Sequence, residues 1–195
     1  MSRLLALATL SFVSAATPGP NNVMLWASGV QFGFRKTVPH LVGITLGVGS
    51  MAVLVAAGLG VLITTVPAVE LGLRVIGSAF LLYLAFQIAV GVETNSKEVA
   101  RPLTMWQAIV FQYVNPKAWV FVLAAVTTFR PDGVGVVWGT LVMAAVMMIV
   151  ILPSASLWAA AGTFLSRFLA DQGRSRAFQI SLGVVLAATV VYIWL

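Results

Sequence analysis

Two short polar segments interrupt long apolar runs and contain the residues best suited to chemistry. The first segment consists of Pro18, Gly19, Pro20, Asn21 and Asn22, and the second of Asn115, Pro116 and Lys117. A proline inside a helix removes a backbone N–H and clashes with the preceding turn, so neither segment favours a continuous helix. A helix that restarts at Pro20 or Pro116 would present unpaired N–H groups and a partial positive charge at its N-terminus.

Such helix ends are suited to binding an anionic group, for example a carboxylate. The three asparagines add side-chain donors and acceptors, and Lys117 adds a full positive charge. We therefore predict that all eight residues of the two segments form a substrate-binding region. In the simpler alternative, the prolines only kink two helices and the asparagines satisfy the freed backbone groups. We prefer that simpler interpretation for Pro153, an isolated proline in another apolar run.

The position of Lys117 inside its apolar run is the sharper signal. A charged side chain near the centre of a membrane helix costs about 3 kcal/mol on insertion scales, and such residues are usually functional. The alternative is that the ammonium group snorkels along the helix to the membrane surface. Because apolar stretches flank Lys117 on both sides, that reach is long, and we predict a functional role.

The composition places most of the chain in lipid rather than in water. Of 195 residues, 61% are hydrophobic and only 8% are charged, whereas soluble domains carry about 25% charged residues. The net charge of +6 comes from scattered basic residues rather than from a patch, which excludes a nucleic-acid-binding domain. With no cysteine, one histidine and five acidic residues, the sequence predicts neither a metal site nor a cofactor.

The apolar runs predict an all-α integral membrane protein with six transmembrane helices. A spanning helix needs about 20 apolar residues, and backbone groups in hydrocarbon must be satisfied within the segment. The expected spans are residues 4–30, 38–66, 72–92, 105–129, 134–162 and 177–195. The first residues resemble a cleaved leader, but the apolar run resumes directly after Pro20, so we expect one interrupted span.

Six spans divide into two sets of three that enter the membrane from opposite sides. Such an inverted-topology repeat is common in secondary transporters. We predict one transmembrane domain over 1–195, made of a first half 1–92, a cytoplasmic linker 93–104 and a second half 105–195. In this 3+3 arrangement, the broken helices one and four occupy corresponding positions.

The basic residues predict the orientation in the membrane. Connections after the first, third and fifth spans carry most of them, namely Arg35, Lys36, Lys97, Arg101, Arg167, Arg174 and Arg176. The opposite side carries Arg3, Arg74 and Arg130. Because cytoplasmic loops are enriched in Lys and Arg, both termini are expected outside the cytoplasm, although Arg3 argues weakly for the reverse.

Some residues support less specific interpretations. Gly43, Gly47 and Gly49 are expected to serve helix packing or gating, by letting the second span approach the broken first span. Their spacing also fits ordinary close packing within one chain. His40, at the cytoplasmic start of the same span, is expected at the membrane interface rather than as a proton carrier. The glycine faces are also compatible with a homodimer.

The segment Ala16–Asn21 resembles the signature of the LysE/RhtB superfamily of bacterial amino-acid exporters. The resemblance continues in Gly33–Lys36, the basic turn after the first span, and in Gly43–Gly47. It extends through Leu73–Gly77 and Asn115–Ala118, so it covers the length of the chain.

The resemblance implies a multi-pass protein of the bacterial inner membrane. Such a protein exports amino acids or similar metabolites without ATP, driven by the proton motive force. The eight residues of the two polar segments then form its central binding region. The sequence differs from the family pattern at Thr37, Phe80 and Ala85, which bears on substrate preference.

The positions of the acidic residues indicate the charge of the expected substrate. They all fall in loops or at span ends, at Glu70, Glu93, Glu98, Asp132 and Asp171. Without a carboxylate in the membrane, the site suits a small neutral zwitterion better than lysine or arginine. We expect an amino acid similar to threonine or homoserine, or one with a branched side chain, exported by alternating access without enzymatic activity.

The sequence gives less support to other classes of membrane protein. Metal-ion export needs soft or acidic ligands within the membrane, and the chain has no cysteine and one histidine. An intramembrane enzyme needs a nucleophile with a base, and Ser50 and Ser78 have neither a histidine nor an acid at a suitable depth. An exporter of another solute or a non-transporting membrane subunit would share the fold, but a subunit would not need two broken helices.

Overall fold

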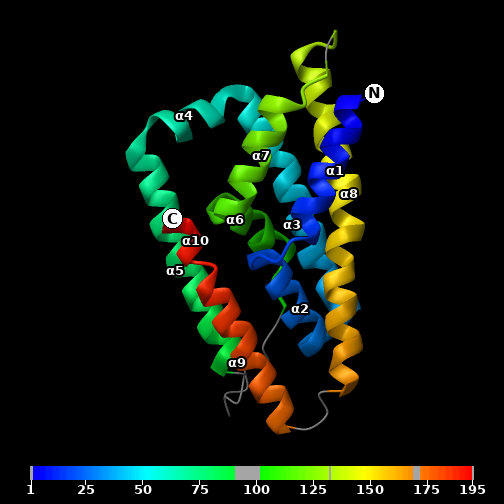
Figure 1. The fold of residues 1–195 in the computed structure, drawn as a ribbon, viewed down its shortest axis with the longest axis vertical. Coiled ribbons are helices and arrows are strands. Elements are labelled where there is room, and N and C mark those ends of the chain that lie inside the picture. Colours follow the sequence, from blue (N-terminus) through cyan, green and yellow to red (C-terminus); the bar gives the residue numbers. More distant parts are fainter. Residues whose placement is uncertain (1, 91–101, 132, 169–171, 195) are drawn as a thin grey trace.

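The computed structural model of the protein describes residues 2–90, 102–131, 133–168 and 172–194, and their regular structure is helical (Figure 1). The first half contains α1 (Ser2–Ala16), α2 (Pro20–Phe32), α3 (Phe34–Leu54), the π-helix η1 (Val55–Leu59), α4 (Gly60–Thr65) and α5 (Pro67–Val90). The second half contains α6 (Met105–Val114), α7 (Pro116–Thr128), α8 (Val136–Leu165), the 3-10 helix η2 (Ser166–Phe168), α9 (Gln172–Ala188) and α10 (Val191–Trp194). Most of the predicted linker, residues 93–101, lies outside the described residues.

Helices occupy each of the six ranges in which spans were predicted. Among the described residues, three continuous helices are long and apolar enough to cross a membrane, namely Phe34–Leu59, Pro67–Val90 and Val136–Phe168. The pair α6 and α7 meets the same criteria together, as one span bent by 75°. Residues Ser2–Ala16 and Arg176–Ala188 form shorter apolar helices. The protein is therefore an almost entirely helical membrane protein.

Both predicted helix breaks are present. In the first half, α1 ends at Ala16 and α2 begins at Pro20, with Gly19 fully extended between them. In the second half, α6 ends at Val114 and α7 begins at Pro116. Each proline opens its helix, where its missing N–H would have had no partner within the helix. The breaks therefore follow from local proline chemistry.

The second predicted span departs from a single straight helix. Regular α-helix ends at Leu54, and the π-helix that follows contains Gly58 at a φ of 109°. Left-handed backbone is open to glycine because glycine has no Cβ. The short helix α4 then crosses the top of the molecule toward α5 (Figure 1). The second span is therefore present as Phe34–Leu59, but it ends before the predicted residue 66, because the Gly58 turn redirects the chain.

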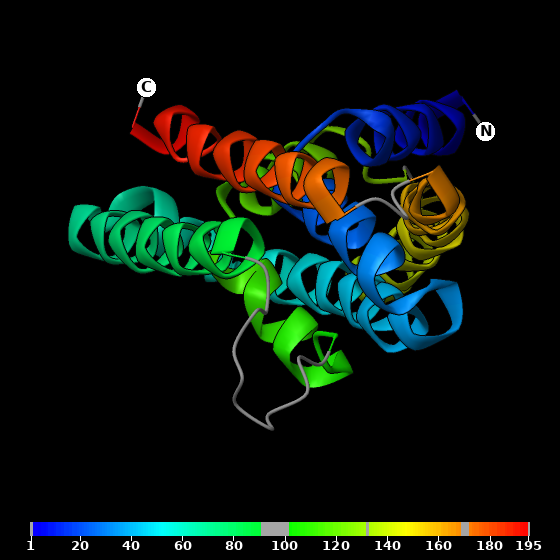
Figure 2. The same cartoon turned by 90° about the horizontal axis from the view of Figure 1, so that it is seen from below.

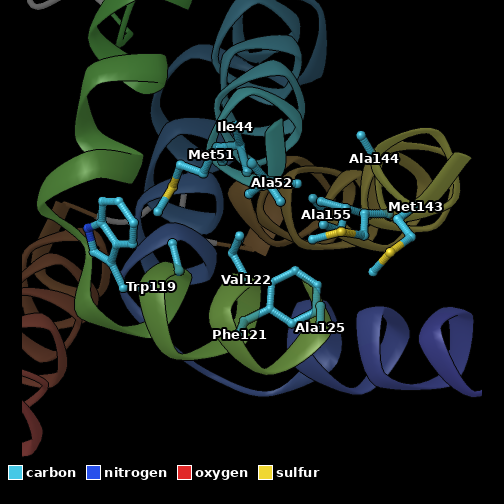
Figure 3. Packing of buried hydrophobic residues seen from close by; sticks show 14 of the residues in the cluster. Ile44, Met51, Ala52, Trp119, Phe121, Val122, Ala125, Met143, Ala144 and Ala155 are labelled. Carbon is cyan, nitrogen blue, oxygen red and sulfur yellow. The ribbon is translucent and has the colours of Figure 1, made fainter. Parts of the chain in front are cut away.

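The helices pack in pairs that join the two halves. The long helix α8 lies along α1, α2 and α3, while α3 also packs against α6. The helices α5 and α9 pair with each other at one side of the molecule (Figures 1 and 2). The main hydrophobic cluster gathers where α7 meets α3 and α8 (Figure 3), and it includes Ile44, Met51, Ala52, Trp119, Phe121, Val122, Ala125, Met143, Ala144 and Ala155. A second cluster lies among α2, α5, α6 and α9, around Met24, Leu81, Phe111, Leu182 and Leu186.

Glycines allow the closest contact between α2 and α8. A Cβ on Gly29 would overlap the backbone carbonyl oxygen of Ala159, and one on Gly162 would overlap that of Trp26. Both obstacles are helix backbone, so neither can move without separating the helices. This reciprocal approach fixes α2, the helix that begins at the first break, against the other half.

We expect that Gly29→Leu lowers the unfolding temperature of the purified protein strongly, because α2 and α8 must separate. Forcing a larger side chain into a filled contact costs about 1–3 kcal/mol. Gly72→Leu is the matched control, since a Cβ there meets nothing within 4 Å. Thermal unfolding in detergent, followed by size-exclusion chromatography, measures both. Equal unfolding temperatures for the two variants would contradict the described contact.

Candidate functional site

Lys117 connects the two broken helices. Its ammonium group donates hydrogen bonds to the carbonyl oxygens of Thr17, at 2.7 Å, and of Pro18, at 3.2 Å. These carbonyls follow the C-terminus of α1, where backbone acceptors lack helical partners and carry partial negative charge. The cation therefore stabilises the broken end of the opposite half, so the charge does not stand alone between helices.

Asparagines satisfy the backbone at both breaks. The amide nitrogen of Asn22 donates to the carbonyl oxygens of Ala15, at 2.9 Å, and Thr17, at 2.7 Å. In the second break, the side-chain oxygen of Asn115 accepts from the backbone N–H of Lys117 at 3.1 Å and caps α7. The alternative in which asparagines repair the breaks thus describes these two residues correctly. Their repairing role leaves the proposed binding role open.

A reciprocal amide pair forms a second link between the breaks. The side-chain nitrogen of Asn21 donates to the oxygen of Gln112 at 2.9 Å, and the nitrogen of Gln112 donates back at 3.2 Å. Gln112 is fully buried on α6 and also donates to the Ala108 carbonyl oxygen. The sequence analysis did not select Gln112. The signal that could have identified it is its position, as a polar residue in an apolar run one helical turn before Asn115.

Two tryptophans donate hydrogen bonds to backbone carbonyl oxygens near the breaks. The indole N–H of Trp158 on α8 donates to the Ala15 carbonyl oxygen at 3.1 Å. In the second half, the indole N–H of Trp119 donates to the Tyr113 carbonyl oxygen at 2.8 Å. Each indole thus satisfies a carbonyl near the end of the helix before a break. These donors were not anticipated, because tryptophan in an apolar run is equally compatible with ordinary packing.

Gly19 leaves room for the Lys117 side chain. A Cβ on Gly19 would lie 2.9 Å from the Lys117 Cδ atom and 3.0 Å from its Nζ atom. The backbone of Gly19 is fully extended, so its conformation alone does not require glycine. The lack of a side chain is what lets the lysine cross to the first break. Pro18 and Pro20 on either side keep this segment out of a helix.

A small cavity of about 50 Å³ lies where the two breaks meet. Its walls include Gly19, Asn21, Asn22, Gln112, Asn115 and Lys117, so the structure brings most of the predicted site residues together. Apolar residues of α3, α7 and α8 close the remaining sides. Polar walls and this volume suit one or two water molecules, which is less space than an amino acid occupies. A molecule of that size would fit between the breaks only after they separate.

The glycines of α3 contact different helices from those expected. A Cβ on Gly43 would overlap the Met105 carbonyl oxygen, and one on Gly47 would lie 2.5 Å from the Gln112 side chain. Gly49 faces Met148 on α8. These glycines therefore let α3 approach α6 and α8 rather than the broken first span. Glycine spacing predicts a smooth helix face, but it carries no information about which neighbour lies on it.

His40 lies inside the protein, so the expected interfacial position is corrected. Only 1% of its surface is exposed. It lies one helical turn after Thr37 on α3, and packing by neighbouring helices covers it. Neither of its ring nitrogens has a hydrogen-bond partner among the described residues.

The relatives of the chain are described as translocators and efflux proteins. The family model for LysE type translocators matches residues 12–194. A cysteine/O-acetylserine efflux protein of Escherichia coli (strain K12) is 30% identical over 186 residues, which cover 94% of this chain and 91% of that protein. A protein of the same description from Salmonella typhi is 29% identical over 187 residues, with the same coverage.

No solved structure matches the chain. The family match and the relatives nevertheless agree with the apolar helices in indicating a transporter of the membrane rather than an enzyme. The match includes both helix breaks and every helix from α2 onward. The chain therefore belongs to the LysE type translocator family.

Proposed function

We propose that the protein exports a small neutral amino acid from the bacterial cytoplasm by alternating access at the two helix breaks. The contact of the Lys117 ammonium group with the carbonyl oxygens of Thr17 and Pro18 carries this proposal. It pairs a cation from one half with acceptors from the other half, at the point where the halves meet. The efflux proteins similar to this chain support cysteine and O-acetylserine as first candidates for the solute.

A zwitterion is the solute that can replace this contact without leaving a charge unpaired. Its carboxylate would take the place of the carbonyl oxygens at Lys117, and its ammonium group would take the place of Lys117 at Thr17 and Pro18. Asn21 and Gln112 would exchange their mutual hydrogen bonds for bonds to the same solute. Each hydrogen-bonding group would thus exchange a protein partner for a solute partner of the same type. The breaks could then separate without leaving buried donors or acceptors unpaired.

The charges at the breaks favour a neutral side chain on the amino acid. The described residues around the small cavity include one cation, Lys117, and no carboxylate. A second positive charge, as in lysine or arginine, would face Lys117 without a compensating acid. We therefore keep the expectation of a neutral substrate, with the proton motive force as the energy source.

The helix pairs support the inverted repeat. The second span packs against the broken fourth span, through α3 and α6, while the fifth span packs against the broken first span, through α8 with α1 and α2. The third and sixth spans pair with each other, through α5 and α9. Exchanging the two halves leaves this set of pairs unchanged, as an inverted 3+3 repeat requires.

Efflux from proteoliposomes tests the proposal directly. Vesicles are loaded with labelled O-acetylserine, cysteine, threonine or lysine and measured with and without an imposed pH gradient. We expect a neutral member of the panel to leave faster through the protein than lysine, and faster still with the gradient. If no member of the panel leaves faster than from empty vesicles, the proposed function is wrong.

Lys117→Met is expected to lower that efflux at least about tenfold while leaving membrane insertion intact, because it removes the cation that the carboxylate needs. Lys117→Arg keeps the charge and should retain part of the activity. Lys36→Met is the matched control, since Lys36 is exposed near the start of α3. If Lys117→Met transports at the rate of the parent chain, the proposed role of Lys117 in the binding site is wrong.

The amide pair should behave as one energetic unit. We expect Asn21→Leu and Gln112→Leu each to lower the unfolding temperature, because each leaves a buried amide without its partner. The free energy of unfolding should fall less in the double variant than the sum of the two single losses, and the difference is an interaction energy of about 1 kcal/mol. The same cycle with Asn21→Leu and Gln87→Leu, an exposed glutamine on α5, should be additive. Additivity in both cycles would contradict the pairing.

The proposed orientation places both termini outside the cytoplasm. The Arg3 guanidinium donates to the Arg130 carbonyl oxygen at 2.9 Å, which puts the N-terminal helix and the connection after α7 at one end. Because the natural chain has no cysteine, single cysteines report their side without background. We expect a membrane-impermeant maleimide to label Ser2→Cys and Val134→Cys in intact cells, and to label Lys36→Cys only after lysis. The opposite labelling pattern would reverse the proposed direction of insertion.

A further inference from the structure

A second and much larger cavity, of about 990 Å³, lies among α2, α5, α6 and α9, apart from the small cavity at the breaks. It extends from the end of α5 at Val90 and the start of α6 at Thr104 inward to Ile76 and Phe111. Figure 2 views the molecule from this end. The basic residues predict that this end faces the cytoplasm. A solute that leaves the cytoplasm would meet this cavity first.

His40 lies in the wall of the large cavity. It is 1% exposed, and both ring nitrogens lack a hydrogen-bond partner among the described residues. Buried polar groups are almost always hydrogen-bonded, because leaving one unsatisfied costs about 1–3 kcal/mol. Both ring nitrogens are covered, so a solute would reach the imidazole only when side chains of the cavity wall move aside, and it would then supply the missing hydrogen-bond partner.

Ser28 presents a hydrogen-bond acceptor beside His40. The Thr37 hydroxyl donates to the Gly33 carbonyl oxygen at 3.0 Å, which uses its one proton. The Ser28 hydroxyl must therefore donate in its 2.8 Å contact with Thr37. The lone pairs of the Ser28 oxygen can then accept from a solute, because Ser28 also lines the cavity. His40 and Ser28 together thus offer both donor and acceptor groups.

The rest of the wall indicates the charge of the solute. The described residues that line the cavity include no Asp, Glu, Lys or Arg. The other polar groups are neutral, and they include Gln31, Gln87, Gln107 and Gln179. Aromatic rings of Phe80, Phe111 and Phe178 form apolar walls. This chemistry suits a solute without net charge that carries both donors and acceptors.

The inner end of the cavity reaches the helix breaks. Met24 and Phe111 line it there and are both buried. Gln112 follows Phe111 directly, and Asn21 lies one turn before Met24. Both lining residues therefore lie within one helical turn, along the chain, of the amide pair at the breaks.

We propose that the large cavity is a separate binding site for the exported zwitterionic amino acid, with His40 as the residue that holds it and Ser28 as an acceptor for its ammonium group. The site takes the solute before Met24 and Phe111 admit it to the breaks. This inference rests on the proposed function for the identity of the solute. The existence of the site rests on the unpartnered imidazole and the cavity.

Substrate protection tests the site without relying on transport. Gln31→Cys places a single thiol at an exposed position of the cavity wall in a chain without cysteine. We expect O-acetylserine and threonine to slow its reaction with a maleimide in detergent, and lysine to have a weaker effect. Thr9→Cys on α1 is exposed and outside the cavity, so no solute should protect it. Equal reaction rates of Gln31→Cys with and without every solute would overturn the proposal.

Variants of His40 assign the binding residue. In the Gln31→Cys background, His40→Leu should raise the concentration for half protection about tenfold, as expected for loss of a hydrogen-bonding partner. His40→Gln keeps a donor and an acceptor and should stay within about threefold of the parent. If His40→Leu does not fold, Ser28→Ala serves instead and should weaken protection in the same direction. Unchanged protection in the folded variants would show that water alone occupies the site of the imidazole.

Lys117→Met separates this inference from the proposed function. In that variant efflux should be lost, while protection of Gln31→Cys persists, because Lys117 does not line the large cavity. Protection without efflux by the parent chain would support the cavity site and refute export. Efflux by the parent with no protection would support export and refute the cavity site.

Discussion

The constraint on which the structure depends is that backbone groups released by a helix break need partners when water is scarce. Proline opens both breaks, and each leaves carbonyl oxygens without helical donors. At the first break, Asn22 and Trp158 donate to Ala15, and Lys117 donates to Thr17 and Pro18. Because Lys117 belongs to the other half, the two breaks can lie in the membrane only while they lie together, or while something else replaces this donor.

The hydrogen bonds that hold the two breaks together also determine which proposed solute could replace them. Lys117 and the carbonyl oxygens of the first break are a cation and its acceptors, and the proposed amino-acid solute carries the complementary charges on two groups attached to the same carbon atom. A solute with only an anionic group would satisfy Lys117 but leave the carbonyls unpaired. A solute with only a cationic group would leave Lys117 without an acceptor. The zwitterion is thus favoured by the bonds that hold the two halves together, in addition to any contact with its side chain.

Features with a local cause could be predicted from the sequence, and features with a distant cause could not. Pro20 and Pro116 act on their own helices, so both breaks were foreseen. The position of Lys117 was informative, but its carbonyl partners lie about a hundred residues away and no periodicity indicates them. Gln112 was missed because its partner, Asn21, belongs to the other half. His40 was expected at the interface because a helix end predicts exposure, whereas packing by neighbouring helices decides burial.

The two cavities make the structure asymmetric about the breaks, and this asymmetry indicates which parts would move in the proposed alternating access. Beyond the breaks, α7 packs into the main hydrophobic cluster with α3 and α8 (Figure 3), and a path on that side would have to open a filled core. On the other side, the large cavity lies among α2, α5, α6 and α9, although α5 still meets α6 where a Cβ on Gly77 would overlap the Val114 carbonyl oxygen. The helices α5 and α9 pair mainly with each other, and they also pack in the second hydrophobic cluster with α2 and α6. In the proposed mechanism, closing the cavity would move this pair and rearrange the second cluster, whereas opening the opposite path would separate α7 from α3 and α8 and break the Lys117 contacts.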